Sequence, residues 1–203
     1  MDYSKNNHKM TIQKDKIVVV DVEATCWRGE PPPGQINEII EIGICLLDMA
    51  TLQPEMKRSI LVRPERSRVS LFCTKLTTLT QDMVDGGIYF GDACDIIKAE
   101  FATETRLWAS WGNYDRRIFQ SQSLLFDVPY PYSPLHMNLK DVFANVANAG
   151  KKVGLMRAVK LCELSAEGTH HRGVDDAWNA AKVLGHMLSQ HGREVIQDQW
   201  QLP

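Results

Sequence analysis

Acidic residues at three places combine types and spacing that could bind divalent metal ions. Asp21 and Glu23 lie two residues apart at the end of an apolar, β-branched segment, IVVVDVE, which is typical of a buried strand. Side chains two residues apart in a strand point to the same face, so both carboxylates would lie together. Buried carboxylates need a counter-charge, and hard oxygen ligands favour Mg²⁺ or Mn²⁺. The alternative is that the strand has already ended and both carboxylates are solvated.

Further acidic groups stand at predicted element boundaries. Asp115 follows a predicted strand and begins a predicted helix, where a carboxylate also simply stabilises the helix dipole. Asp175 and Asp176 open the last long helix, with His171 shortly before them. We expect Asp175 to be the N-cap or exposed and Asp176 to face the sheet. The alternative for this segment is a capped helix with a surface histidine.

Taken together, these residues predict a two-metal site with a general base. Two divalent ions held by such carboxylates can activate water and stabilise the departing oxygen of a phosphodiester. An imidazole such as that of His171 titrates near neutral pH and suits the removal of a proton from the water. Bound cations would also reverse the local field and let an acidic protein bind a polyanion.

Length and composition limit the class of protein. The chain has 203 residues, 44% of them hydrophobic, which fits one globular domain and excludes wholesale disorder. Its net charge of −2 is not that of a protein that passively coats nucleic acid. We expect no membrane contact, because no apolar run approaches the ~20 residues of a span and the polar N-terminus lacks a signal-peptide core. Five cysteines without a CxxC pair predict no structural zinc and no disulfide framework, and favour the cytoplasm.

The elements that position these residues are mostly strands early in the chain and helices late. Residues 1–15 read as a flexible polar leader and residues 16–203 as a single domain. The predicted strands are 17–23, 38–48 and 58–63, which form a meander, and 107–111. The predicted helices are part of 71–80, then 92–103, 115–125, 138–148, 154–164 and 175–190, with Asn113 as a candidate N-cap. This order predicts an α/β sandwich.

Five segments resemble motifs of a known enzyme family. The three exonuclease motifs of the DEDDh branch of the DnaQ-like 3′–5′ exonucleases are similar to VVVDVEATCW, WGNYD and HHRGVDD. The Eri/THEX subgroup, the histone-mRNA 3′-end exonuclease family, is similar at EIIE (38–41) and LFCTKLTTLTQ (71–81). The resemblance runs from about residue 16 to residue 190. It implies an α/β, RNase H-like fold with a central mixed five-stranded sheet flanked by helices.

The resemblance also implies roles for single residues. His171 would be the general base, because its spacing from the last motif Asp fits better than that of His170. The implied ligands of two divalent ions, Mg²⁺ or Mn²⁺, are Asp21, Glu23, Asp115 and Asp176, and Glu23 also counts as catalytic. The implied contacts of the terminal nucleotide are the backbone of Glu23 and Ala24, a wedge of Leu76 and Thr77, and Tyr114, which could stack or hydrogen-bond.

Basic and aromatic residues give weaker indications. Lys140 and Arg172 are our candidates for a phosphate path because they lie near the motifs, although each could be part of a solvated helix face. The other basic candidates are Arg116, Arg117, Lys151, Lys152 and Arg157. Four tryptophans are expected to pack in the core: Trp108, Trp111, Trp178 and Trp200. The subgroup often has glycine where this chain has Thr78, so the shape of that loop is open.

The resulting hypothesis is a metal-dependent 3′–5′ exonuclease acting on single-stranded nucleic acid with a free 3′ end. RNA is preferred over DNA because of the resemblance at 71–81, and the product is a nucleoside 5′-monophosphate. Two alternatives stay open: a DNA-directed repair or proofreading exonuclease of the same fold, and an inactive module that binds RNA ends.

Overall fold

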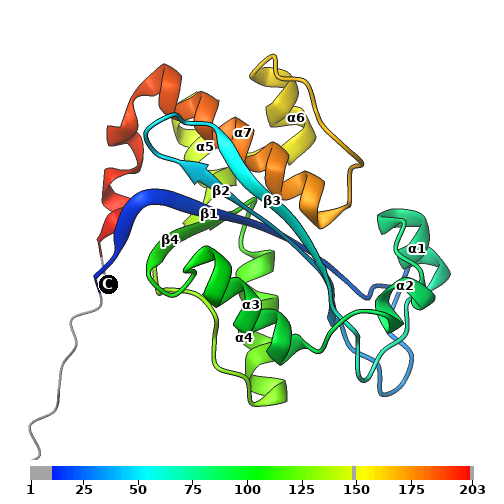
Figure 1. Ribbon diagram of the computed structural model, residues 1–203. Helices are drawn as coiled ribbons and strands as arrows, with labels where there is room; N and C mark the ends of the chain where they lie inside the picture. The colour runs from blue at the N-terminus through cyan, green and yellow to red at the C-terminus, as the bar shows by residue number, and fades with distance from the viewer. Residues whose placement is uncertain (1–10, 148–149, 202–203) are drawn as a thin grey trace, which may run out of the picture.

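A computed structural model describes residues 11–147 and 150–201 and shows a mixed five-stranded sheet between helices (Figure 1). The sheet order is β3-β2-β1-β4-β5. The strands are β1 (Gln13–Ala24), β2 (Ile39–Asp48), β3 (Pro54–Leu61), β4 (Arg106–Ser110) and β5 (His136–Asn138). The first three form an antiparallel meander, whereas β4 runs parallel to β1 and β5 parallel to β4. The predicted mixed sheet and early meander are confirmed.

Helices cover both faces of the sheet (Figure 1). One face packs against α5 (Leu139–Ala147), α6 (Leu155–Leu161) and α7 (Gly173–His191), and the other against α3 (Phe90–Phe101) and α4 (Tyr114–Phe126). The remaining elements are α1 (Leu71–Thr77), α2 (Gln81–Asp85) and a 3₁₀ segment, η1 (Arg193–Trp200). Among the residues described, no helix combines the length and apolar character needed to cross a membrane.

Alternation along β1 separates the two cores and sets the direction of the acidic side chains. Ile17 packs with α5, α6 and α7, whereas its neighbour Val18 packs with α3 and α4. Both are fully buried, as expected for a central strand covered on both faces, and each burial stabilises the fold by about 1.5–3 kcal/mol. The same alternation carries Asp21 and Glu23 to the α7 side, which confirms that they share a face.

Two short elements escape the sequence pattern. Strand β5 has three residues and α2 has five, and neither is long enough to show a period. β1 begins at Gln13, inside the predicted leader, because the Gln13 backbone N–H donates to the Thr105 carbonyl at 2.7 Å. Residues 1–10 of that leader and residue 148 of the predicted helix 138–148 lie outside the described part of the chain.

Helix starts also differ from expectation. Helix α7 begins at Gly173 with Arg172 in the N-cap position, and the Asp175 side chain is only 16% exposed, so the prediction of Asp175 as N-cap or exposed is wrong. Asp175 instead accepts a hydrogen bond from the Thr169 backbone N–H at 2.8 Å and pairs with Lys57. Asn113 does occupy the N-cap position of α4, although its side chain makes no capping hydrogen bond.

Candidate active site

Four acidic side chains from three elements meet near the carboxyl end of β1. Asp21 and Glu23 come from β1, Asp115 from the first turn of α4 and Asp176 from the first turn of α7. All four line one cavity of about 460 Å³. The carboxylate oxygens of Asp21, Glu23 and Asp176 lie within 4.8 Å of one another. The structure therefore brings together the four acidic residues that the sequence singled out.

Asp115 is held in the site by the backbone of β1. The Val22 backbone N–H donates to Asp115 Oδ1 at 3.0 Å, and the Asp115 residue is only 4% exposed. Helix α4 follows β4, which is the parallel neighbour of β1, so its first turn lies beyond the carboxyl ends of both strands. This is the edge at which open α/β sheets bind ligands.

Asp176 reaches the site because α7 begins directly on the main chain of the sheet. A Cβ atom on Gly173 would lie 2.8 Å from the Asp21 carbonyl oxygen, a separation that side chains do not tolerate. Only a glycine at this position lets the first turn of α7 approach β1 so closely. Asp176 follows one turn later and is 4% exposed, which confirms that it faces the sheet.

The carboxylates repel one another strongly. Burial and the charges of Asp115 and Glu23 raise the pKa of Asp21 well above its ordinary value. Burial, together with the carboxylates of Asp176 and Glu41, raises the pKa of Glu23 to about 8. A divalent cation would remove this repulsion, and the clustered oxygen donors are the ligands that Mg²⁺ and Mn²⁺ prefer. The residues present therefore fit the metals predicted for the site.

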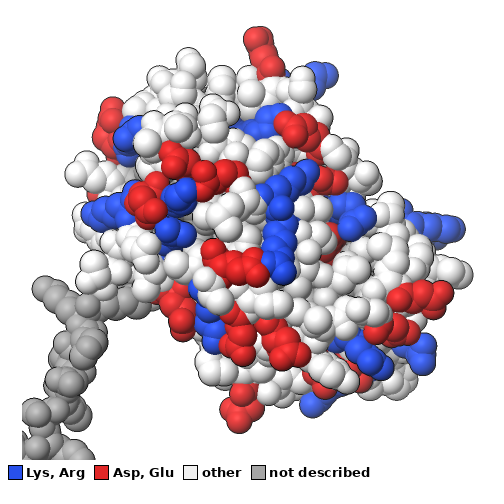
Figure 2. All heavy atoms as spheres, viewed as in Figure 1, with Lys and Arg blue, Asp and Glu red and all other residues white. Residues whose placement is uncertain are grey.

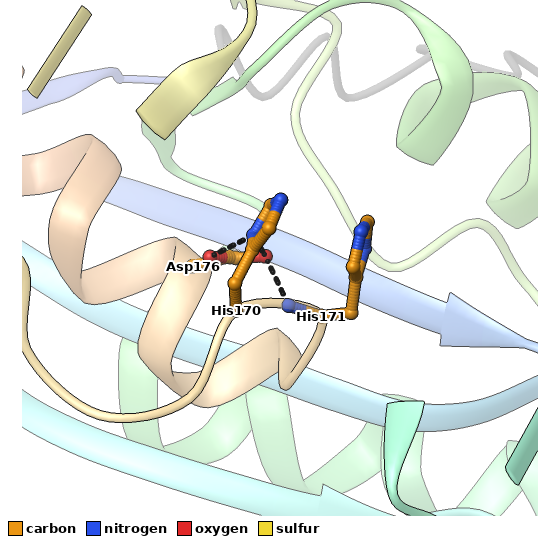
Figure 3. A group of neighbouring side chains, drawn as sticks. All are labelled: His170, His171 and Asp176. Atoms are coloured by element: carbon orange, nitrogen blue, oxygen red, sulfur yellow. Dashed lines mark hydrogen bonds and ion pairs between the residues drawn. The ribbon is translucent and has the colours of Figure 1, made fainter. Parts of the chain in front are cut away.

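Two adjacent histidines contact Asp176 in different ways (Figure 3). The His170 ring atom Nδ1 lies 3.0 Å from Asp176 Oδ2, whereas the backbone N–H of His171 donates to the same oxygen at 2.9 Å. The two rings stack with centroids 3.8 Å apart. His171 adopts a φ of 64°, in the left-handed region, which costs a non-glycine residue about 1–2 kcal/mol and is typical of constrained functional sites.

His171 has the protonation behaviour of a base. Burial and the neighbouring His170 lower the pKa of His171 below its ordinary value of 6.5, against the opposing effect of Asp176. Its imidazole is therefore neutral at pH 7 and able to accept a proton. Both histidines line the same cavity as the carboxylates, so a water held there would be near either ring.

The predicted nucleotide contacts lie around the same end of β1. Tyr114 lines the cavity and is 46% exposed, and Ala24 ends β1 one residue after Glu23. Leu76 and Thr77 belong to α1, where Leu76 is half-buried and Thr77 is buried. The Thr77 hydroxyl donates to the Cys73 carbonyl at 3.0 Å.

Helix α1 is attached to the end of β1. The hydroxyl of Ser70, which is the N-cap of α1, donates to the Cys26 carbonyl at 2.6 Å. The Cys73 thiol lies 3.4 Å from the Ala24 carbonyl oxygen. These contacts place α1 beside the backbone that the resemblance assigns to the terminal nucleotide.

Two basic residues, Lys140 and Arg172, were predicted from the sequence to contact phosphates. Neither lines the cavity that the described residues form. Lys140 belongs to α5, and the Arg172 guanidinium forms an ion pair with Glu41 at 3.0 Å. Among the lysine and arginine side chains that the structure describes, the one that lines it is Arg157, at the start of α6, from the wider set of candidates.

Trp111 and three residues at the start of α6 were missed as cavity residues, whereas their neighbour Arg157 was among the basic candidates. Trp111 packs on Phe143 with ring centroids 5.8 Å apart, as expected of a core residue, yet it also lines the cavity. Its indole N–H donates to the Val153 carbonyl at 3.1 Å, which brings the following residues to the site. Those lining residues are Gly154, Leu155, Met156 and Arg157. No local sequence signal marks Gly154, Leu155 or Met156, because only the tertiary path of the chain brings α6 to the cavity.

A second groove, of about 570 Å³, starts beside the first. Tyr114 lines both, and from there the groove follows one side of α4. Its other lining residues are Ile36, Asn37, Arg117, Ile118, Ser121, Gln122 and Leu125. The combined surface is therefore longer than the first cavity alone.

Comparisons with known proteins identify the family of this chain. The profile of the RNase_T family, described as Exonuclease, matches residues 18–184. The 3′-5′ exoribonuclease 1 of Homo sapiens is 32% identical over 193 residues, which cover 89% of this chain and 54% of the relative. ERI1 exoribonuclease 2 of Danio rerio is 43% identical over 197 residues, which cover 85% of this chain and 35% of the relative. The chain thus spans about half the length, or less, of these curated relatives.

Solved structures lead to the same family. The nuclease domain of 3′hExo, a DEDDh family member bound to rAMP, superposes with a TM-score of 0.76 at 29% identity, covering 87% of this chain and 93% of that chain. Exonuclease I matches with a TM-score of 0.69 at 11% identity, over 90% of this chain and 42% of that chain, and supports the fold alone. The RNase H-like fold implied by the motifs is confirmed. The chain belongs to the RNase_T exonuclease family, in its DEDDh branch.

Proposed function

We propose that the protein is a metal-dependent 3′–5′ exonuclease that hydrolyses single-stranded 3′ ends, prefers RNA and releases nucleoside 5′-monophosphates. The observation that carries the proposal is the meeting of four acidic side chains with His171 in one cavity. The RNA preference is supported by relatives that are named exoribonucleases. The free cysteine thiols suit a reducing compartment, and we propose the cytoplasm as its location.

The carboxylates would hold the metal ions. Two divalent cations, Mg²⁺ or Mn²⁺, would bind Asp21, Glu23, Asp115 and Asp176. When bound, they would polarise the attacking water and neutralise charge on the phosphate and the departing 3′ oxygen. Asp176 also accepts the His170 ring and the His171 backbone N–H, so this carboxylate joins the metal site to the histidine loop.

His171 would accept the proton of the attacking water. Its neutral imidazole at pH 7 makes it a competent general base for this step. The oxygen–phosphorus bond to the penultimate nucleotide breaks as the water oxygen bonds to phosphorus. The terminal nucleotide then leaves with its 5′ phosphate. The departing 3′ oxygen takes up a proton from water and becomes the 3′ hydroxyl of the shortened strand, and His171 releases its proton to the solvent.

The cavity would take one nucleotide at a time. Its volume of about 460 Å³ lies in the usual range for small-molecule sites, and Trp111 and Tyr114 offer aromatic surfaces for a base. Arg157 would meet a phosphate. Basic and acidic side chains are interspersed over the face in Figure 2, so charge on that face gives no broad cationic surface. The backbone of Ala24 and the wedge of Leu76 and Thr77 would contact the terminal nucleotide, and Lys140 and Arg172 would meet phosphates outside the cavity.

The test is cleavage of a 5′-labelled single-stranded RNA beside DNA of the same sequence, with Mg²⁺ or Mn²⁺ and with EDTA. We expect a metal-dependent ladder that shortens from the 3′ end, and faster cleavage of RNA. Faster cleavage of DNA would favour the repair-type alternative. No cleavage of either by folded, metal-bound protein would favour the end-binding module.

Two matched histidine variants test the base. We expect His171→Ala to lower kcat by about 10²–10⁴-fold, the usual contribution of general base catalysis, while His170→Ala retains most of the activity. Both lie in the same loop, so a shared structural defect would affect them alike. A larger loss in His170→Ala would reverse the assignment.

A further inference from the structure

Glu41 is a buried carboxylate beside the site that the proposed mechanism does not use. It lies on β2 directly opposite Glu23 and is 0% exposed. Its oxygens accept bonds from Arg172 Nε at 3.1 Å, Arg172 Nη2 at 3.0 Å, the Gly173 backbone N–H at 2.9 Å and the Ser59 hydroxyl at 2.6 Å. Burying an ionised carboxylate is costly unless it is paired and hydrogen-bonded, and here both conditions are met.

Three of these four bonds come from the segment that starts α7. Arg172 is the N-cap of α7 and Gly173 is its first residue. The Asp176 backbone N–H donates back to the Arg172 carbonyl at 2.9 Å. His171, immediately before Arg172, donates its own N–H to the Asp176 carboxylate. Residues 171–176 therefore form one hydrogen-bonded turn, and Glu41 is its anchor on the sheet.

The contact between the Arg172 guanidinium and the Glu41 carboxylate fixes the orientation of the two groups as well as the distance between them. Two parallel bonds between a planar guanidinium and a planar carboxylate hold both groups in one arrangement, which a single lysine charge would not do. Glu41 is not among the residues that line the catalytic cavity, and its oxygens are already engaged. It is therefore placed to orient the metal ligands and not to be one.

We propose that Glu41, through Arg172 and Gly173, is a positioning residue that sets His171 and Asp176 against the carboxylates of β1. The inference rests on the proposed function for the meaning of that site. The contacts of Glu41 with Arg172 and Gly173 predict that replacing Glu41 weakens metal binding, which can be measured without measuring cleavage.

Glu38 offers a matched control. It is also 0% exposed and lies three residues before Glu41. Its carboxylate accepts the backbone N–H groups of Glu65 at 2.8 Å and Arg66 at 3.0 Å, in the loop after β3. Glu38→Gln and Glu41→Gln each remove one buried negative charge, and only the second removes the anchor of α7.

The experiment measures Mn²⁺ binding by calorimetry and single-stranded RNA cleavage for both variants, with thermal unfolding as the check on folding. For Glu41→Gln we expect Mn²⁺ affinity and kcat to fall about 10–100-fold, the usual effect of losing a group that orients metal ligands, with KM changed less than about threefold. Glu38→Gln should stay within about twofold of the wild type on both readouts. Equal effects of the two variants would overturn the proposal.

Two further variants separate positioning from charge. Arg172→Lys keeps the positive charge but loses the paired bonds, so we expect it to share the defect; wild-type values would overturn the proposal. It also provides the test if Glu41→Gln fails to fold. The double variant Glu41→Gln/Arg172→Gln removes one negative and one positive charge, so its net charge equals that of the wild type. Recovery of Mn²⁺ affinity and kcat toward the wild-type values would show that charge alone matters and would overturn the proposal.

Failure of the proposed function is distinguishable from failure of this inference. A wild-type protein that binds Mn²⁺ without cleaving either strand contradicts the exonuclease, while the Mn²⁺ affinities still decide the role of Glu41. A wild-type protein that neither binds Mn²⁺ nor cleaves contradicts both.

Discussion

Gly43 and Gly173 face each other across the contact of β2 with α7 with no room for a side chain. A Cβ atom on Gly43 would lie 1.8 Å from the Gly173 carbonyl carbon and 2.1 Å from its oxygen. The obstacle is main chain, so it cannot rotate away as a flexible side chain would. Gly43 is also the cross-strand partner of Asp21, which places this contact beside the proposed metal ligands.

Gly43→Ala is accordingly expected to force the start of α7 off the sheet. Overpacking of this kind costs about 1–3 kcal/mol of unfolding free energy, and the displaced Asp176 should lower kcat at least tenfold. Urea unfolding and cleavage kinetics measure the two effects. Gly29→Ala is the control, because nothing lies within 4 Å of its added Cβ. Wild-type stability in Gly43→Ala would contradict the close contact.

Asp21→Asn should change stability in opposite directions with and without metal. In EDTA at pH 8 the raised pKa of Asp21 means that folding must either bury its charge among repelling carboxylates or take up a proton, and both cost stability. Asn avoids both costs, so the thermal midpoint of the variant should rise. With Mn²⁺ at about 100 times its Kd, the wild type should gain about 2.7 kcal/mol and the variant much less. The variant should remain folded by circular dichroism but fail to cleave. Equal Mn²⁺ shifts, or an active variant, would remove Asp21 from the ligand set.

Arg157 is expected to bind substrate phosphate at the mouth of the cavity. Because a hydrogen bond to a charged group contributes about 1.5–3 kcal/mol, Arg157→Ala should raise KM for RNA at least tenfold with a small change in kcat. The dependence of KM on salt should weaken as one phosphate contact is lost. Lys140→Ala, measured in parallel, tests the residue that sequence position favoured. An unchanged KM in Arg157→Ala would exclude this contact.

His136 should make the fold sensitive to acid. Burial lowers the pKa of His136 to about 4, and its Nε2 lies 2.9 Å from the Ser110 hydroxyl. The unfolded chain takes up this proton near pH 6.5 and the folded chain only near pH 4. Stability therefore falls as the pH drops through that interval, by at most about 3 kcal/mol.

The measurement is the free energy of unfolding in urea at pH 7.0 and pH 4.5. His136→Gln keeps a hydrogen-bonding group near Ser110 but cannot take up the proton, so the variant should lose less stability on acidification. Identical pH dependence in the two proteins would show that His136 titrates normally in the fold.

Thr78→Gly should stabilise the protein. Thr78 ends α1 with φ 65° and ψ 0°, a left-handed conformation that is costly for a β-branched residue and free for glycine. We expect a gain of about 1 kcal/mol, measured by urea unfolding. Thr74→Gly, inside the same helix, should instead lose about 0.3 kcal/mol, the difference in helix propensity between threonine and glycine. A destabilised Thr78→Gly would mean that its side chain has a favourable contact.

Much of the site could be predicted because it depends on local pattern. The apolar run before Asp21 identified a buried strand, and alternation placed Glu23 beside it. Asp115 and Asp176 stood at element boundaries, where side chains gather at a sheet edge. Thr78 shows a limit of the motif comparison, because the subgroup often has glycine at this position. The backbone of Thr78 still adopts the left-handed conformation that glycine favours. The threonine therefore changes the energy of the loop but not the shape of the turn.

The rest depends on tertiary placement. Arg172 lies near the motif in sequence, but its guanidinium binds Glu41 because the register of β1 and β2 brings that carboxylate under α7. Arg157 enters the site only through the path of the chain after Trp111. The spacing that favours His171 says nothing of ring orientation, and it is the His170 ring that contacts Asp176.

The anchor between Glu41 and Gly173 joins residues 132 positions apart in the chain. On a translating ribosome, β1 and β2 leave the exit tunnel long before α7 is made. Until then the nascent chain lacks both Asp176 and the histidine loop. Under the proposed function, a nascent chain can therefore hydrolyse RNA only after α7 has been synthesised and packed on the sheet.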